Sequence, residues 1–289
     1  MISSNQIKTY YNLAKPGIIY GNLLTAAAGY LFASHWQNHY INLVAMLIGL
    51  GLIIGSSCVL NNVIDKGLDI KMERTKKRAT VTGKISDKSA LIYATILAVL
   101  GIVILGIFTN RLAVFTSLFG MLIYIVFYGY AKRKTVYGTL VGSLAGAVPP
   151  LVGYTAYTNF IDLAGIMLLF VLICWQLAHF YGIALYRKKE YKAAGLPVWP
   201  IVKGDWSAQV QAIGSIALFS LFAISLFLFG YCGFIYIATV LVLGIGWLWY
   251  TVIHAGKLSA AVWGRKVFLS SLVVILVFSL AISFGPILP

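Results

Sequence analysis

The chain has 289 residues, of which 61% are hydrophobic and 10% are charged, and its mean hydropathy is +0.91. Soluble globular domains carry roughly 25% charged residues, so this composition excludes that class. The three cysteines, Cys58, Cys174 and Cys232, lack the CxxC and CxxCH spacings of zinc, redox or covalent-haem sites. They are therefore interpreted as small apolar filling residues.

Nine apolar runs follow one another along the chain, each long enough to cross the roughly 30 Å of hydrocarbon in a bilayer. They lie at about 17–34, 41–64, 89–108, 112–131, 135–158, 163–186, 207–229, 234–255 and 267–287. This pattern predicts an all-α polytopic membrane protein, a bundle of about nine transmembrane helices. We expect residues 1–289 to form a single domain.

The net charge is +15, from 22 Lys and Arg and seven Asp and Glu. With nine spans, the N-terminal segment and the loops after spans two, four, six and eight share one side of the membrane. These segments hold every Lys and Arg except Arg111. Because positive loops mark the cytoplasmic side, we expect a cytoplasmic N-terminus and a location in the cell's inner or plasma membrane. The same distribution favours anionic lipid and anionic substrates, not nucleic acid, as partners.

Three of the seven acids fall in residues 61–74, directly after the second run. Asn61, Asp65 and Asp69 are four residues apart, which on a helix aligns three oxygen-bearing side chains along one face. Carboxylate and amide oxygens suit Mg²⁺, which completes its coordination with water and substrate phosphates. The stretch therefore predicts a metal and diphosphate site at a membrane surface. The alternative is a solvated loop whose acids relieve its dense positive charge.

The sixth run carries a second group of polar residues. Trp175, Gln176 and His179 lie within its apolar body, and Tyr186 and Glu190 lie at its end. His179, Tyr186 and Glu190 are spaced to share one helical face. The second and sixth runs end on the same side of the membrane, so we expect the two groups to face each other across one cavity.

These local sequences resemble the UbiA superfamily of intramembrane prenyltransferases. Asn61-x-x-x-Asp65-x-x-x-Asp69 is similar to the first acidic motif of that superfamily. Longer strings resemble its haem-directed farnesyltransferase branch, and the resemblance covers about residues 13–205. The strings are residues 61–76, 132–139, 146–154, 175–179 and 191–204.

The resemblance implies a bundle of nine spans with a lateral, membrane-facing cavity that is capped on the cytoplasmic side. We expect the active site to open toward the cytoplasm. The implied reaction transfers a farnesyl group from farnesyl diphosphate to a vinyl group of haem B, with addition of water and with Mg²⁺ as cofactor. Its products are haem O and diphosphate. Implied partners are the two substrates, the lipid bilayer, and a haem O-modifying enzyme or an oxidase-assembly protein.

The resemblance also implies roles for individual residues. The metal and catalytic set is Asn61, Asp65 and Asp69, with Glu190 as the acid of the second motif. The diphosphate-binding set is Arg74, Lys77, Lys132, Arg133 and Arg187, and the haem-binding set is His179, Trp175 and Tyr186. Many superfamily members carry two or more aspartates in the second motif, whereas here Tyr186 replaces one and Glu190 is the only acid. This departure favours haem over an aromatic acid or quinone.

Two other functions remain open at this point. One is prenylation of a different acceptor, and the other is a membrane transporter with an intramembrane acidic site. A transporter of this kind predicts inverted repeats around broken helices, and no clear repeat is present.

Overall fold

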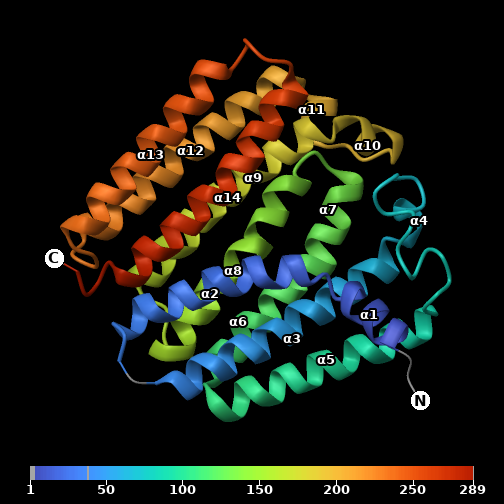
Figure 1. Cartoon of the computed structure of the whole chain (residues 1–289), viewed down its shortest axis with the longest axis horizontal. Coiled ribbons are helices and arrows are strands. Elements are labelled where there is room, and N and C mark those ends of the chain that lie inside the picture. Colours follow the sequence, from blue (N-terminus) through green and yellow to red (C-terminus); the bar gives the residue numbers. More distant parts are fainter. Residues whose placement is uncertain (1–3, 38, 289) are drawn as a thin grey trace.

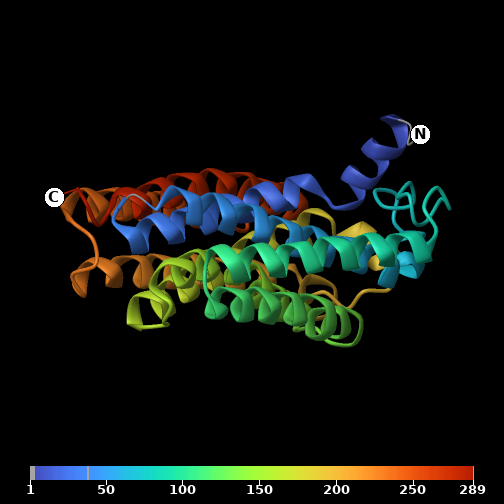
Figure 2. The same ribbon diagram turned by 90° about the horizontal axis from the view of Figure 1, so that it is seen from below.

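The computed structural model describes residues 4–37 and 39–288. Within them the chain is helical, and its longer elements run roughly side by side in two tiers (Figures 1 and 2). The elements are α1 (Ser4–Leu13), α2 (Pro16–Ser34), α3 (Tyr40–Ile64), α4 (Lys66–Asp69), α5 (Asp87–Phe108), α6 (Arg111–Leu122), the π-helix η1 (Ile123–Tyr128), α7 (Gly129–Lys134), α8 (Gly138–Thr158), α9 (Leu163–Tyr186), α10 (Lys188–Ala193), α11 (Trp199–Val202), α12 (Asp205–Leu228), α13 (Phe234–His254) and α14 (Ala260–Phe284).

Eight helices in the described part of the chain are long and apolar enough to cross a membrane, with α6, η1 and α7 together forming one of them. The remaining predicted span corresponds to α8, a helix of 21 residues whose glycine, proline and threonine residues reduce its hydropathy. The prediction of an all-α polytopic membrane protein is confirmed. Large apolar side chains such as Phe115, Leu228 and Val242 point outward, at 68%, 72% and 76% exposure. This outward apolar surface is what a bilayer requires.

Close backbone contact joins α2 to α8. A Cβ atom added to Gly153 would overlap the Ala26 carbonyl oxygen, and one added to Gly29 would overlap the Pro150 carbonyl oxygen. Small residues at such crossings allow helices to pack without a hydrophobic driving force between them. This contact holds the N-terminal spans against the centre of the bundle.

Two consecutive prolines, Pro149 and Pro150, lie inside α8 without ending it. Proline cannot donate the usual helical hydrogen bond to the residue four positions earlier. For Pro150 that residue is Gly146, and its carbonyl oxygen instead accepts a hydrogen bond from Gln176 Nε2 of α9 at 3.3 Å. The side chain of Gln176 thus takes the place of the missing backbone donor.

The short helices α4, α7 and α10, which carry several of the predicted site residues, lie at one end of the bundle (Figure 1). The loop after α4 packs against the segment after α9, because Met72, Ala194 and Leu196 form a small buried cluster with Leu68 and Tyr191 at its edge. Thus the structure brings together the two segments that the sequence placed on one side of the membrane.

Candidate active site

The first acidic motif begins on α3 and continues past its end. Backbone hydrogen bonds keep the helical spacing of the motif beyond the end of α3. The Asp65 N–H donates to the Asn61 carbonyl oxygen at 2.9 Å, and the Asp69 N–H donates to the Asp65 carbonyl oxygen at 2.8 Å. The helix ends at Ile64, and Asp65 and Asp69 lie at its cap and at the end of α4. All three side chains are buried. The spacing of one turn between successive motif residues is therefore kept.

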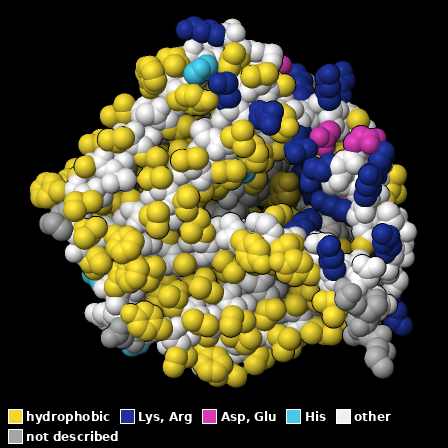
Figure 3. Space-filling view, in the orientation of Figure 1, with side chains coloured by type: hydrophobic (Ala, Val, Ile, Leu, Met, Phe, Trp, Pro, Cys, Tyr) yellow, Lys and Arg dark blue, Asp and Glu magenta, His cyan; other side chains and the backbone are white. Residues whose placement is uncertain are grey.

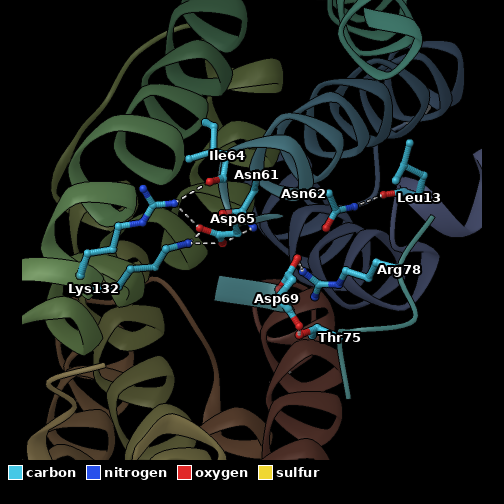
Figure 4. Close-up of polar contacts among 10 residues, drawn as sticks. Leu13, Asn61, Asn62, Ile64, Asp65, Asp69, Thr75, Arg78 and Lys132 are labelled. Carbon is cyan, nitrogen blue, oxygen red and sulfur yellow. Dashed lines mark hydrogen bonds and ion pairs between the residues drawn. The ribbon is translucent and has the colours of Figure 1, made fainter. Parts of the chain in front are cut away.

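Asp65 is held by two cations from α7. Lys132 Nζ forms an ion pair with Asp65 Oδ2 and donates to Asn61 Oδ1 at 3.0 Å, and Arg133 Nη2 donates to Asp65 Oδ1 at 2.7 Å (Figure 4). Arg133 also donates to the Ile64 carbonyl oxygen at 2.8 Å. Burial by itself raises the pKa of the Asp65 carboxyl, but the charges and hydrogen bonds of Lys132 and Arg133 outweigh it and lower that pKa. Asp65 is therefore an anion.

Asp69 has its own cation, which the sequence prediction did not include among the site residues. Arg78 Nη1 lies 2.5 Å from Asp69 Oδ2, and the Thr75 hydroxyl donates to the Asp69 carbonyl oxygen at 3.0 Å (Figure 4). These contacts fold the loop after α4 back over the acidic motif. Nothing in local spacing distinguishes Arg78 from the other cations of this loop, so only the folded chain identifies it.

Lys15 is a second cation that the sequence prediction missed. It precedes Pro16 with a left-handed backbone, φ 57°, at the start of α2. Burial lowers the pKa of Lys15 to about 8, while the nearby Asp69 and Asp65 raise it and Arg78 lowers it further. Asn62 Nδ2 donates to the Leu13 carbonyl oxygen at 2.9 Å and so ties this junction to α3. Lys15 thus adds a positive charge near the acidic motif.

Glu190 lies on α10, and the prediction that it shares a helical face with His179 and Tyr186 is wrong. The helix α9 ends at Tyr186 and Arg187 has φ −105° and ψ 21°, so the helical register does not continue to Glu190. Arg187 Nη1 donates to Glu190 Oε1 at 2.9 Å. Glu190 Oε2 is buried and has no hydrogen-bond partner among the described residues.

The other predicted diphosphate residues are placed unequally. Arg74 is exposed but lies close enough to Tyr191 of α10 to influence it: burial raises the pKa of Tyr191, and the charges of Arg74 and Arg187 counter that rise. Lys77 is exposed and forms no hydrogen bond or ion pair within residues 4–37 and 39–288. The structure therefore brings Lys132 and Arg133 to the motif but not Lys77.

The predicted haem residues separate into two places. His179 stacks on Trp175 with ring centroids 5.0 Å apart, and its Nδ1 lies 2.7 Å from the Ser271 hydroxyl of α14. Tyr186 instead lies near two guanidinium groups: its ring centroid is 5.3 Å from Arg187 Cζ and 5.8 Å from Arg265 Cζ. Tyr186 is thus near the polar end of α9, whereas Trp175 and His179 lie deeper in the span.

A row of aromatic rings connects the acidic motif to His179. Lys132 Nζ lies 4.9 Å from the ring centroid of Tyr128, and a Cβ atom on Gly142 would lie 3.0 Å from the Tyr128 ring and 3.7 Å from the Phe180 ring. Phe180 in turn lies 5.5 Å from the ring of His179. Tyr128 also stacks on Tyr124 at 5.7 Å, both on the π-helix. π-helical turns are frequent at functional sites.

One face of the molecule is hollowed. Figure 3 shows a depression near the centre of the face, with Lys and Arg side chains gathered on the side where α4, α7 and α10 lie. Apolar side chains cover much of the rest of this face. A ligand with an anionic head and an apolar tail would match this distribution of charge.

The acidic motif also fits a divalent cation by its donor chemistry. Two carboxylates and an amide, from Asp65, Asp69 and Asn61, are buried and supply the oxygen donors that Mg²⁺ prefers. The surrounding cations Lys132, Arg133 and Arg78 balance these carboxylates. A diphosphate–magnesium pair would supply both the counter-anion for these cations and the counter-cation for the carboxylates.

Comparison with known proteins identifies the family of this chain. The sequence matches the UbiA prenyltransferase family over residues 22–285. It is 42% identical to "Protoheme IX farnesyltransferase" of Edwardsiella ictaluri over 278 residues, 96% of this chain and 94% of that protein. It is 40% identical to the protein of the same name from Photorhabdus laumondii over 284 residues, 98% of this chain and 97% of that one.

Solved structures share the fold at lower sequence identity. A structure of digeranylgeranylglyceryl phosphate synthase superposes with a TM-score of 0.80 and 19% identity, over 97% of this chain and 98% of that one. A UbiA homolog from Archaeoglobus fulgidus bound to GPP and Mg²⁺ superposes with a TM-score of 0.70 and 19% identity, over 95% and 99%. The chain is an all-α, multi-pass membrane protein that belongs to the UbiA prenyltransferase family.

Proposed function

We propose that this chain is a haem B farnesyltransferase, which joins farnesyl diphosphate and haem B with the addition of water to give haem O and diphosphate. The relatives named protoheme IX farnesyltransferase support the choice of substrates, because they are at least 40% identical over nearly the whole chain. The observation that carries the chemistry is the buried pair of aspartates, each held by its own cations.

The cations would bind the diphosphate and stabilise its departure. Lys132 and Arg133 on α7 and Arg78 on the loop after α4 converge on Asp65 and Asp69 from different elements. Fixed positive charges aimed at a leaving group lower the barrier to its departure, because its negative charge grows as the C–O bond breaks. We include Lys15 in this set because of its place near both aspartates.

Mg²⁺, held by Asn61, Asp65 and Asp69, would supply Lewis-acid stabilisation of the leaving diphosphate when it is bound. Its oxygen donors are buried, which limits competition from solvent. The unpaired Glu190 Oε2 supports a further contact from the second motif, either to a metal-bound water or to a hydroxyl donor.

The aromatic row would shield the allylic carbon from bulk water. Tyr124, Tyr128 and Phe180 line the way from the acidic motif to His179 and Trp175. Aromatic faces stabilise cations, and a dry environment prevents early capture of the farnesyl cation by water. We propose that the haem vinyl group lies at the deep end of this row, beside Trp175 and His179.

We propose that the active site opens toward the cytoplasm at its charged end and that the protein lies in the plasma membrane. The support is the concentration of Lys and Arg at the end of the bundle that carries α4, α7 and α10 (Figure 3). We also propose that residues 1–289 act as one domain; residues 1–3, 38 and 289 lie outside the described part. A haem O-modifying enzyme or an oxidase-assembly protein would receive the product from the bilayer.

Purified protein supplied with haem B, farnesyl diphosphate and Mg²⁺ tests the proposal. We expect a product with the mass and retention of haem O, formed together with one diphosphate. A competition series with quinone and aromatic-acid acceptors tests acceptor choice. Folded protein that releases diphosphate but farnesylates one of those acceptors, and not haem B, would contradict the haem assignment.

A further inference from the structure

The Ser271 hydroxyl determines which nitrogen of His179 carries a proton. Ser271 Oγ lies 2.6 Å from the Phe268 carbonyl oxygen, one turn earlier on α14, and 2.7 Å from His179 Nδ1. Two oxygens at that separation need a proton between them, and the hydroxyl has only one to give. It therefore donates to Phe268 and accepts from His179. Consequently Nδ1 of His179 is protonated, and Nε2 carries a free lone pair.

The position of Ser271 is itself held by the packing of α9 against α14. Trp175 Nε1 donates to the Ser271 carbonyl oxygen at 2.8 Å. A Cβ atom on Gly264 would lie 2.6 Å from the Gly182 carbonyl oxygen, so the two backbones touch there. The serine side chain is fully buried. The His179–Ser271 contact is thus built into the helix pair and does not depend on a mobile surface group.

Gln176 presents a second free acceptor one turn from His179. Gln176 Nε2 donates a hydrogen bond to the Gly146 carbonyl oxygen, which lacks its usual helical donor because residue 150 is proline. This bond fixes the orientation of the amide. Its Oε1 is buried and has no hydrogen-bond partner in the described part of the chain. Residues three apart on a helix lie on one face, with Cβ atoms about 5–6 Å apart. One face of α9 therefore carries the buried acceptor Gln176 Oε1 and the acceptor His179 Nε2, to which no described residue donates a hydrogen bond.

A water molecule is the smallest group that donates to two acceptors. A buried acceptor without a partner, such as Gln176 Oε1, is costly, and ordered water is the usual way in which proteins satisfy one. Two hydrogen bonds of about 2.8 Å reach across a gap of the size expected between such side chains. A metal ion in the acceptor's porphyrin would account for His179 Nε2 but not for Gln176 Oε1.

We propose that Gln176 Oε1 and His179 Nε2 hold the water molecule that adds to the haem side chain, and that Ser271 positions His179 for this task. This inference rests on the proposed function. The farnesyl carbon bonds to the terminal vinyl carbon as diphosphate leaves with the C–O electron pair. The water oxygen then bonds to the remaining cationic carbon, and His179 Nε2 accepts the released proton. No oxidant or reductant is needed.

If the bound water is lost, the carbocation on the haem side chain can become neutral by losing a proton from the adjacent carbon. That elimination gives an alkene lighter than haem O by one water. The test therefore measures the ratio of this alkene to haem O by mass spectrometry, with water enriched in ¹⁸O to identify the added oxygen. Diphosphate release is measured in parallel and reports the farnesyl-transfer step separately.

In His179→Ala and Gln176→Leu we expect the alkene fraction of the farnesylated product to rise at least about tenfold, whatever the total rate, because the barrier to water addition rises by about 1.4 kcal/mol or more. Ser271→Ala should raise it less, and Ser271→Thr, which keeps the hydroxyl, should resemble the unaltered protein. His254→Ala is the matched histidine control, since the only hydrogen bond that its ring makes to a described residue is to the Tyr250 carbonyl oxygen on α13. His179→Phe keeps a ring against Trp175 if the alanine variant does not fold.

An unchanged product ratio in folded His179 and Gln176 variants that still release diphosphate would overturn the inference. A changed haem absorption spectrum with an unchanged ratio would also overturn it and would identify His179 as a ligand of the iron. Failure of the unaltered protein to make either product would instead refute the proposed function.

Discussion

Asp65 and Asp69 are buried acids whose charge is balanced by side chains from other parts of the chain. Asp65 pairs with Lys132 and Arg133, 67 and 68 residues later, whereas Asp69 pairs with Arg78 nine residues later. Removing one member of a buried ion pair is more costly than the pair is worth, because the remaining charge is left without a partner. Each aspartate therefore has a structural role as well as its proposed ligand role.

Replacing Asp65 by asparagine tests both roles. We expect kcat for haem O formation to fall by about 10²-fold or more, the size of effect produced by loss of a group that stabilises a developing charge. Asp87→Asn is the control, because Asp87 forms a half-exposed pair with Lys66 and lies outside the motif. Steady-state assays on both folded variants make the comparison. Equal losses of kcat in the two variants would show that Asp65 has no special role in the reaction.

Lys15 predicts a specific pH dependence. Its pKa of about 8 means that it is charged below pH 8 and becomes neutral as the pH rises through that value. We expect KM for farnesyl diphosphate to rise about fivefold between pH 7 and pH 9, because a charged hydrogen bond is worth about 1.5–3 kcal/mol. Lys15→Arg stays charged and should show a flat profile over this range. An identical rise in that variant would place the titrating group elsewhere.

At the scale of elements, the crossing of α2 and α8 depends on the absence of side chains. Backbone oxygens occupy the space that a Cβ atom on Gly153 or Gly29 would need. The neighbouring atoms belong to the backbone, so relief requires that the helices move apart. That movement would also disturb the part of α8 where the Gly146 carbonyl oxygen accepts a hydrogen bond from Gln176 Nε2.

Gly153→Ala should therefore destabilise the protein by about 1–3 kcal/mol or more, the range for overpacked cores. Gly106→Ala on α5 is the matched control. Its Cβ atom would meet nothing within 4 Å, and alanine is favoured over glycine in a helix by about 1 kcal/mol. Thermal unfolding of the two variants in detergent, followed by circular dichroism, gives the comparison. A Gly153 variant as stable as the Gly106 variant would contradict the tight crossing.

At the scale of the whole molecule, the Lys and Arg residues define one face of a membrane bundle. Cations of α4 and the loop after it, of α7 and of α10 all contribute, and Figure 3 shows Lys and Arg gathered on the side of the molecule where these elements lie. The sidedness of this face decides which compartment supplies farnesyl diphosphate and receives diphosphate. The proposal of a cytoplasmic opening is thus a statement about substrate supply.

Cysteine labelling in intact cells tests that sidedness. The three native cysteines are buried, which reduces background reaction. We expect Glu73→Cys, on the exposed loop after α4, to react with a membrane-impermeant maleimide only after the membrane is opened. Ile161→Cys, on the loop between α8 and α9 at the other end of the bundle, should react in intact cells. The reverse pattern would invert the proposed topology.

The sequence alone predicted the all-α membrane fold, the approximate positions of the spans and the collection of the charged groups at one end of the bundle. These properties follow from hydropathy and charge, which are sums over local residues and need no knowledge of contacts. The spacing of Asn61, Asp65 and Asp69 along the helix was also predictable from the sequence, because hydrogen bonds between adjoining turns preserve it. Family resemblance then supplied the roles of Lys132 and Arg133, which the fold does bring to Asp65.

Only the tertiary structure decided which cation meets which acid. Many Lys and Arg share the charged face, and spacing does not distinguish Arg78, which pairs with Asp69, from Lys77, which is exposed. The end of α9 before Glu190 and the Ser271 partner of His179, 92 residues away, were likewise beyond reach of a local pattern. The physical reason is that these contacts depend on how helices cross. Crossing is set by close backbone approach at Gly153 and Gly264, whose consequences appear only in the packed bundle.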